Sequence, residues 1–332
     1  MSEATITAEI PQPQPTTAQG PASPRRQQFD LTQARPFIYK SVSEETRAAY
    51  HRAIREFFAF VGNTHPAGVT PADVIAYRDH LRTKEKRKAN TVATKLAIVR
   101  SFFEYLKADG QIPLNPASTK LVTPPELPTE PQGRALTPKE VRYLLSGPDR
   151  SKREGARDYA IMLVMLRLSL RLAEVSTLRV SAIKWSHGRW ILRCKIKGGK
   201  EETWPLPKDV KQAIDEYLKL DAQRRRTLHS DGDVAYLFQP TLNYRTLVFD
   251  KPLSQRMIQK IVARWGEFSG VGKVTPHDLR RTVVTKLLND GHTYREVQMV
   301  TKHKDPKTIM KYDHARENLD SSPVNSLSYE GD

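Results

Sequence analysis

A proline-rich segment constrains the fold more than any other part of the sequence, because it divides the chain. Between Leu121 and Gly133, prolines stand at positions 124, 125, 128 and 131. Prolines at this density prevent regular backbone hydrogen bonding and favour a semi-extended linker. The chain has 332 residues, more than a single hydrophobic core usually serves. We therefore predict two domains, at residues 37–120 and 134–317, joined by a linker at 121–133.

Both ends of the chain are expected to lie outside these domains. Residues 1–36 are rich in Pro, Gln, Thr and Ala without an apolar period, which predicts a disordered tail with order beginning near Ser41. Residues 318–332 form a second predicted tail, in which Leu319, Val324 and Leu327 stand among Ser, Asn and Pro. These apolar residues can dock either on the same domain or on a neighbouring copy of the chain.

The first domain shows the apolar spacing of helices. Ser41 and Glu44 have the spacing of a capping box, and apolar residues then recur every three or four positions. Thr70-Pro71 marks the start of a second helix, and a third periodic segment ends before Gly110. We predict a small helical domain.

A basic run lies between the second and third of these helices. Such a run is either a solvated surface or a contact to nucleic acid backbone, whose phosphates attract clustered Lys and Arg. The chain has 54 Lys and Arg against 37 Asp and Glu, a net charge of +17 that favours a polyanionic partner. We therefore favour contact with DNA. The predicted DNA-binding residues are Arg82, Lys84, Lys86, Arg87, Lys88, Asn90 and Thr91.

The composition makes several other classes of protein unlikely candidates for this chain. Cys194 is the only cysteine, which excludes an intramolecular disulfide and a cysteine-cluster metal site. The nine histidines show no HExxH spacing, so we expect neither a metal ion nor a cofactor. No apolar run reaches the roughly 18 residues that cross a bilayer, and the N-terminus lacks the plan of a signal peptide. We expect a cytoplasmic, nucleoid-associated protein without a membrane partner.

The second domain combines helices with a few strands. Residues 159–170 are apolar nearly all round, as in a buried helix. Apolar residues alternate from Trp190 to Ile196, and Gly198-Gly199 predicts a two-residue hairpin turn. The expected fold is mainly α with a small antiparallel β-sheet: a helical N-terminal domain followed by a mixed α+β domain.

Two cations in this domain have alternative explanations. Arg171 follows the buried helix directly, and its charge requires a partner, which is either Glu174 or a ligand phosphate. Lys197 stands where a strand enters the hairpin turn. It is either an ordinary surface lysine or an ammonium that reaches a scissile bond and donates a proton to the departing oxygen.

Polar groups suited to phosphoryl transfer gather between residues 275 and 312. His277 and Arg280 are three residues apart, so on a helix both can reach one phosphate. His303 follows, and Tyr312 lies beyond Asp305-Pro306, which predicts a helix start about two turns before the tyrosine. A tyrosine with a pKa near 10 is a weak nucleophile, so it needs a proton acceptor and a phosphate made electrophilic by nearby cations.

The set of six residues in this order resembles the tyrosine recombinases, the phage integrase and Xer-type family. The resemblance extends over about residues 40–320 and implies a SAM-like core-binding domain at 37–120 and a catalytic domain at 134–317. It also implies site-specific DNA strand exchange through a 3′-phosphotyrosyl intermediate and a Holliday junction, without metal or ATP. The catalytic residues that it implies are Arg171, Lys197, His277, Arg280, His303 and Tyr312, with Glu174 in a supporting acidic position.

Two positions depart from the pattern of this family. Ser169 and Lys302 stand where the family commonly has glycine, and Lys302 is a candidate contact to DNA backbone. The partners implied by the resemblance are double-stranded DNA with inverted half-sites, a homotetramer on two DNA sites and accessory proteins. Two alternatives remain: a type IB-like topoisomerase, and a non-catalytic DNA-binding regulator with the same fold.

Overall fold

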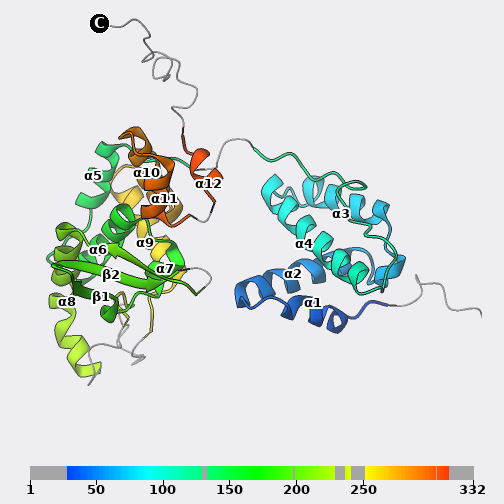
Figure 1. The fold of residues 1–332 in the computed structure, drawn as a ribbon, viewed down its shortest axis with the longest axis horizontal. Helices are drawn as coiled ribbons and strands as arrows, with labels where there is room; N and C mark the ends of the chain where they lie inside the picture. Colours follow the sequence, from blue (N-terminus) through cyan, green and yellow to red (C-terminus); the bar gives the residue numbers. More distant parts are fainter. Residues whose placement is uncertain are drawn as a thin grey trace, which may run out of the picture. The chain divides into compact units, whose positions relative to one another are not determined.

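The computed structural model of the chain describes residues 28–128, 133–196, 199–228, 236–240, 251–303 and 305–313. The chain divides into two compact units, Met1–Thr129 and Glu130–Asp332, each with its own hydrophobic core (Figure 1). The predicted tail at residues 318–332 lies outside the described residues, as do residues 1–27 of the N-terminal one.

The first unit is helical, as its apolar spacing predicts. Phenylalanines from its second and fourth helices form an aromatic cluster, in which the rings of Phe57 and Phe103 meet edge to face at 5.9 Å. Thr70 and Asp73 form a capping box at the start of the third helix. The elements of this unit are η2 (Leu31–Ala34), α1 (Arg35–Tyr39), α2 (Glu44–Phe60), η3 (Pro66–Gly68), α3 (Pro71–Thr83) and α4 (Ala89–Ala108).

The expected start of order near Ser41 is wrong, because residues 28–40 are folded onto this unit. The Phe29 ring is buried and stacks on Phe58, with ring centroids 3.6 Å apart. Ala34 and Phe37 are also buried in the same core. Helices as short as η2 and α1 give no measurable apolar period, so the sequence does not indicate which residues of this segment enter the core.

The second unit is built around one buried helix, α6 (Arg153–Leu168), which packs against α8, α9 and α10. Its N-terminal turn begins earlier than the apolar residues at 159–170 predict. Around it lie the helices α5 (Pro138–Ser146), α7 (Leu172–Ser176), η4 (Val180–Ala182), α8 (Lys208–Leu228), α9 (Gln255–Phe268), α10 (Pro276–Asn289), α11 (Tyr294–Thr301) and α12 (Lys307–Met310).

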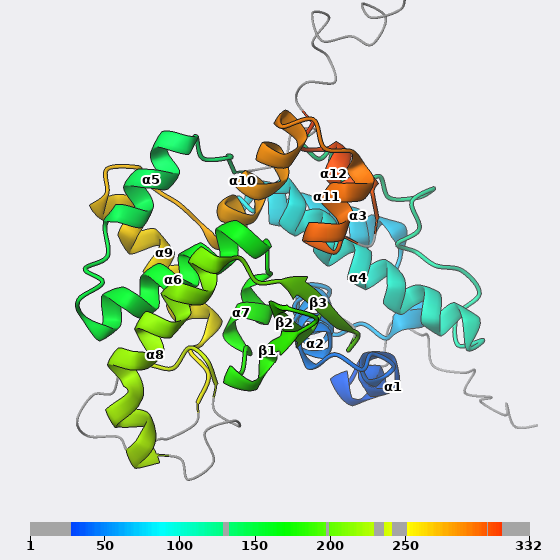
Figure 2. The same ribbon diagram turned by 60° about the vertical axis from the view of Figure 1, so that its left-hand side comes forward.

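A three-stranded antiparallel sheet completes this unit, in the order β1 (Ile183–Ser186), β2 (Arg189–Lys195) and β3 (Glu201–Pro205) (Figure 2). Leu192 pairs with Trp204 across β2 and β3, and both side chains are buried in the core that also contains α6. The predicted pairing of these two strands is therefore present. The predicted two-residue turn at Gly198-Gly199 is wrong, because Lys195 pairs with Glu201 and five residues separate that pair. Strand β1 was not predicted, because its four residues include the exposed Trp185 and show no clear alternation. Mainly helical structure with a small antiparallel sheet agrees with the predicted fold class.

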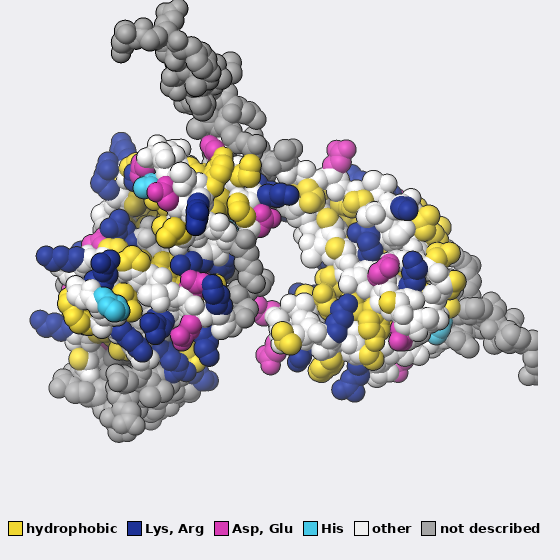
Figure 3. Space-filling view, in the orientation of Figure 1, with side chains coloured by type: hydrophobic (Ala, Val, Ile, Leu, Met, Phe, Trp, Pro, Cys, Tyr) yellow, Lys and Arg dark blue, Asp and Glu magenta, His cyan; other side chains and the backbone are white. Residues whose placement is uncertain are grey.

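The surface agrees with the charge of the chain. On the face of the second unit drawn in Figure 3, Lys and Arg side chains predominate over Asp and Glu. Among the helices that the structure describes, none combines the length and the hydropathy that a membrane span requires.

Candidate active site

A cavity of about 600 Å³ in the second unit brings together five of the six predicted catalytic residues. The start of α7 contributes the first of them, α10 the next two, and the segments that follow α11 and α12 the last two. These lining residues are Arg171, His277, Arg280, His303 and Tyr312. The sixth, Lys197, lies outside the described residues.

Arg171 is held at the start of α7 by Glu174. Its Nη1 donates to Glu174 Oε1 at 2.9 Å, and Glu174 Oε2 accepts from the Arg171 backbone N–H at 2.7 Å. The acidic partner proposed from the sequence is therefore present. Because the side chain of Arg171 is still 30% exposed and lines the cavity, the guanidinium remains accessible to a phosphate as well.

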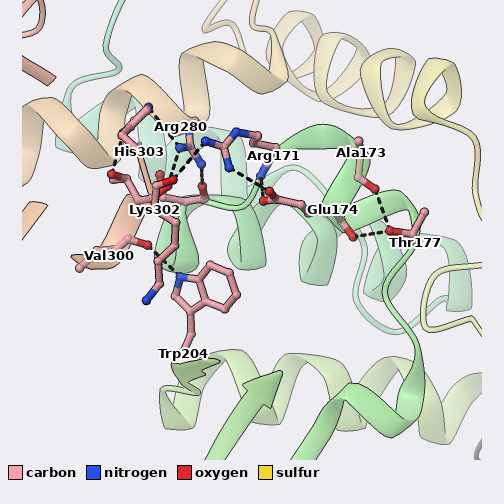
Figure 4. A network of polar contacts seen from close by, with 11 residues as sticks. Arg171, Ala173, Glu174, Thr177, Trp204, Arg280, Val300, Lys302 and His303 are labelled. Carbon is pink, nitrogen blue, oxygen red and sulfur yellow. Dashed lines mark hydrogen bonds and ion pairs between the residues drawn. The ribbon is translucent and has the colours of Figure 1, made fainter. Parts of the chain in front are cut away.

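Arg280 is buried and held by backbone carbonyls rather than by a carboxylate (Figure 4). Its guanidinium donates to the Ser169 carbonyl and, at 2.5 Å, to the Thr301 carbonyl. Burial and, less strongly, the nearby charge of Arg171 lower the pKa of Arg280 to about 10. The group stays protonated at neutral pH, so two fixed positive charges face one cavity.

The two positions that depart from the family pattern both have left-handed backbone. Ser169 ends α6 with φ of 53°, and Lys302 ends α11 with φ of 52°. This region favours glycine, since a Cβ crowds the backbone there. The turn at Ser169 directs its carbonyl toward Arg280, and the Lys302 carbonyl accepts from Arg171 Nη2 at 3.3 Å. Both turns therefore help to hold the arginines.

His303 belongs to a chain of hydrogen bonds that defines its protonation. Arg280 Nη2 lies 3.1 Å from His303 Nε2, and His303 Nδ1 lies 2.7 Å from Thr301 Oγ1. The Thr301 hydroxyl donates to the Val297 carbonyl at 2.8 Å, so it accepts from an Nδ1–H. Nε2 then accepts from the arginine. Burial, followed by the charges of Arg280 and Arg171, lowers the pKa of His303 to about 4, and the ring is neutral at pH 7.

Tyr312 lies just beyond α12, not two turns inside a helix as the sequence predicts. The Asp305 side chain accepts from the Lys307 backbone N–H at 2.9 Å, but Pro306 rather than Asp305 is the N-cap, and the helix ends at Met310. The Tyr312 hydroxyl lies 3.3 Å from His277 Nε2. Burial and the charge of Arg281 lower the pKa of His277, which favours the neutral ring that can accept a proton.

Several residues of this site were missed from the sequence. The Arg281 guanidinium lies over the Tyr312 ring, 5.1 Å from its centroid, and also donates to the Gly133 carbonyl. Its place directly after Arg280 is the only sequence signal for it. Glu202 pairs with Lys302 at 3.0 Å, and nothing in the sequence connects these two residues, which are a hundred positions apart.

The predicted DNA-binding residues lie in the first unit, at the end of α3, in the turn that follows it and in the first turn of α4. All seven are exposed: Arg82, Lys84, Lys86, Arg87, Lys88, Asn90 and Thr91. Within the described ranges, no three His, Cys, Asp or Glu side chains gather closely enough to hold a metal ion.

Comparison with known proteins gives two matching families. Residues 134–318 match the phage integrase family, and residues 33–111 match the phage integrase N-terminal SAM-like domain. The tyrosine recombinase XerC of Roseiflexus sp. (strain RS-1) is 30% identical over 292 residues, which cover 86% of this chain and 88% of that protein. The tyrosine recombinase XerD of Listeria monocytogenes serotype 4b (strain F2365) is 29% identical over 284 residues, covering 83% and 90%.

A solved structure shares the fold. The XerH site-specific recombinase, bound to its palindromic difH substrate in a post-cleavage complex, superposes with a TM-score of 0.65 at 18% sequence identity. The alignment covers 87% of this chain and 82% of that one.

Proposed function

The chain belongs to the phage integrase family of tyrosine recombinases, and from this membership we propose that its cavity cuts and rejoins DNA strands with Tyr312 as the nucleophile. The function is site-specific DNA recombination. The observation that supports the assignment of the nucleophile is the Tyr312 hydroxyl beside His277 in a cavity lined by two arginines. We propose residues 134–317 as the catalytic domain and residues 37–120 as a DNA-binding domain.

In the proposed reaction, the Tyr312 oxygen attacks a DNA phosphorus while its proton passes to neutral His277 Nε2. A bond from the tyrosine oxygen to phosphorus forms, and the bond from phosphorus to the 5′ oxygen breaks. The 3′-phosphotyrosyl link retains the energy of the phosphodiester. A 5′ hydroxyl from another strand can then reverse the step, which exchanges strands without a nucleotide cofactor.

Arg171 and Arg280 would stabilise the charge that develops on the phosphate oxygens. Guanidinium groups meet such oxygens through paired hydrogen bonds and remain charged at physiological pH. The contacts of Arg171 with Glu174 and of Arg280 with backbone carbonyls fix both groups before DNA arrives. Preorganised donors of this kind are worth about 10²- to 10³-fold each in comparable sites.

The two alternative functions are less well supported. A non-catalytic regulator has no use for a tyrosine hydroxyl aligned with a neutral histidine next to two buried or half-buried arginines. A type IB-like topoisomerase shares the chemistry, but the relatives that match most of the chain are named tyrosine recombinases XerC and XerD.

The replacement Tyr312→Phe tests the proposed nucleophile. It removes one hydroxyl, so we expect no covalent protein–DNA adduct and nearly unchanged DNA affinity. The assay is a denaturing gel of protein mixed with nicked DNA carrying its recombination site, which can be found by sequencing DNA fragments trapped on the wild-type protein. Tyr143→Phe, at an exposed tyrosine of the same unit, is the matched control and should cleave normally. A covalent adduct formed by Tyr312→Phe would disprove the assignment.

We propose Lys197 as the group that protonates the departing 5′ oxygen. It is expected at the hairpin between β2 and β3, and it lies outside the described residues. Lys197→Ala should then bind DNA normally and cleave slowly. A substrate whose 5′-bridging oxygen is replaced by sulfur should restore the rate, because a thiolate leaves without a proton. If Lys197 only contacts DNA backbone, the variant will instead bind weakly and sulfur will not rescue it.

We also propose that double-stranded DNA with inverted half-sites is the substrate, and that four copies act on two such sites. The proposal is supported by the family and by the closed symmetry that four active sites on two duplexes require. Accessory proteins belong to the same proposal.

A further inference from the structure

The Trp204 side chain from β3 lies beside the left-handed turn at Lys302 (Figure 4). Lys302 Nζ pairs with Glu202 Oε2 at 3.0 Å, and the two side chains are only 20% and 17% exposed. The same ammonium lies 5.4 Å from the centroid of the Trp204 ring. Trp204 Nε1 donates to the Val300 carbonyl at 2.8 Å. Strand β3 thus contacts both the side chain of Lys302 and the backbone just before it.

The backbone held in this way is the one that supports the arginines. The Thr301 carbonyl accepts from Arg280, and the Lys302 carbonyl accepts from Arg171. A left-handed conformation is unfavourable for a residue with a Cβ, and it persists where the surroundings fix it. Glycine would adopt the same turn without any such support.

We propose that Glu202 and Trp204 are positioning residues for the active site: with the Lys302 side chain they form a clasp that keeps the end of α11 in its left-handed turn. This left-handed turn fixes the positions of Arg171, Arg280 and His303 in the active site. The clasp makes a lysine acceptable at a position where the backbone favours glycine. The inference rests on the proposed roles of the two arginines.

The other role for Lys302, a contact with DNA backbone, requires an ammonium group that is not held by other side chains of the protein. Glu202 instead receives hydrogen bonds from both Lys200 and Lys302, and these lower the pKa of its carboxyl group. The carboxylate is therefore charged at neutral pH and holds both cations. Lys200 is 75% exposed, and its Nζ lies 2.6 Å from Glu202 Oε1. In the contacts described above, Lys200 touches neither Trp204 nor the turn at Lys302.

The test is a double-mutant cycle between Glu202→Gln and Lys302→Gly. Glu202→Gln keeps the shape of the side chain and removes the charge, so the turn loses its support. We expect single-turnover cleavage to slow by about tenfold, as for directly coupled neighbours, with unchanged affinity for a half-site. Adding Lys302→Gly should restore the rate, because glycine needs no clasp. Lys302→Ala, which keeps the Cβ without the ammonium, should cleave as slowly as Glu202→Gln.

The control is Lys200→Met, which removes the exposed partner of Glu202 and should leave both rate and affinity unchanged. All variants are compared with saturating protein and well below the lowest melting temperature, so that a loss of folded protein is not mistaken for a loss of rate.

Two results would overturn the clasp. In the first, Glu202→Gln slows cleavage by the same factor in the wild-type protein and in the Lys302→Gly variant. In the second, Lys302→Gly weakens half-site binding and lowers the salt slope by about one, as expected for a phosphate contact. Cleavage by the wild type and its loss in Tyr312→Phe are measured in the same assay. Failure of the rescue alone overturns only the clasp, whereas no cleavage by the wild type overturns the proposed function as well.

Discussion

Both arginines of the cavity donate to a backbone carbonyl at a left-handed residue. Arg280 donates to the carbonyl of Ser169, and Arg171, whose nearer partner is the Glu174 carboxylate, donates to that of Lys302. Carbonyls orient a guanidinium without neutralising its charge, whereas a carboxylate would compete with the phosphate. Arg171 has one carboxylate partner and remains partly exposed, and Arg280 has carbonyl partners and is buried. The arrangement leaves positive charge available where a phosphate would enter.

Replacement of Ser169 by glycine should stabilise the protein. Ser169 has φ of 53° and is buried, and its hydroxyl has no hydrogen-bond partner among the described residues. Glycine removes both the crowded Cβ and the unpaired hydroxyl, which together cost about 1–2 kcal/mol. We expect a melting temperature higher by about 2–4 °C, measured by differential scanning calorimetry. A lower melting temperature would mean that the side chain packs favourably. Ser146→Gly, at an exposed helical serine, is the control and should destabilise slightly.

Stability should also fall as the solution is acidified, because of His303. Its pKa is about 4 in the folded protein and near 6.5 when unfolded, so between these values the unfolded state binds the additional proton. The free energy of unfolding should therefore decrease as the pH falls from about 6.5 to about 4. Denaturant titrations of wild type and His303→Gln would measure this, and the variant should lose less stability over the window. His51→Gln, at an exposed histidine, is the control; equal acid sensitivity in His303→Gln would contradict the assignment.

The sequence predicts which residues meet in the cavity better than it predicts how they are held. Arg171, His277, Arg280, His303 and Tyr312 are reactive types in a family order, so resemblance identifies them. The contacts of Arg280 with carbonyls depend on backbone angles at Ser169 and Lys302. Neither side chain signals a left-handed turn, and so that part could not be predicted.

At the scale of elements, regular periodicity was predicted and short segments were not. The helix predicted to start at Thr70-Pro71 and the pairing of β2 with β3 are present. The capping box predicted for Ser41 and Glu44 is wrong, because the N-cap of α2 is Ser43, which accepts from the Thr46 backbone N–H at 3.4 Å. Strand β1 and helix η2 contain too few residues for a period to show, and the helix predicted from Asp305-Pro306 is shorter than expected. Their positions depend on contacts with distant parts of the chain, such as the packing of Phe29 on Phe58.

The turn between α3 and α4 gives a prediction at this scale. If its exposed cations neutralise DNA phosphates, each replacement by Ala should weaken binding of all sequences alike and lower the salt slope by about one. Lys84→Ala and Lys88→Ala are the variants, and filter binding of a half-site across salt concentrations is the measurement. Lys139→Ala, on the second unit, is a charge-matched comparison. If neither Lys84→Ala nor Lys88→Ala changes the salt slope of binding, the basic run between α3 and α4 is a solvated surface and not a DNA contact.

For the whole molecule, the C-terminal residues give a test of the proposed assembly. If the tail docks on a neighbouring copy, deleting residues 318–332 should hardly change the binding of one half-site but should reduce cooperative binding to a full site. Docking within the same copy would leave cooperativity unchanged. Gel-shift titration with half-site and full-site DNA distinguishes these outcomes, and the full-length protein is the reference.

The nearness of Tyr312 to the arginines has a further consequence for a mixture of copies. The five predicted catalytic residues in the cavity lining all belong to one unit of one chain. If Tyr312 is the nucleophile, as proposed, each protomer supplies its own nucleophile in cis. A protein lacking the tyrosine hydroxyl and a protein lacking the Arg280 guanidinium therefore cannot complement each other. Mixed on one DNA site, the two inactive variants should remain inactive, because neither can lend its missing group to the other's cavity.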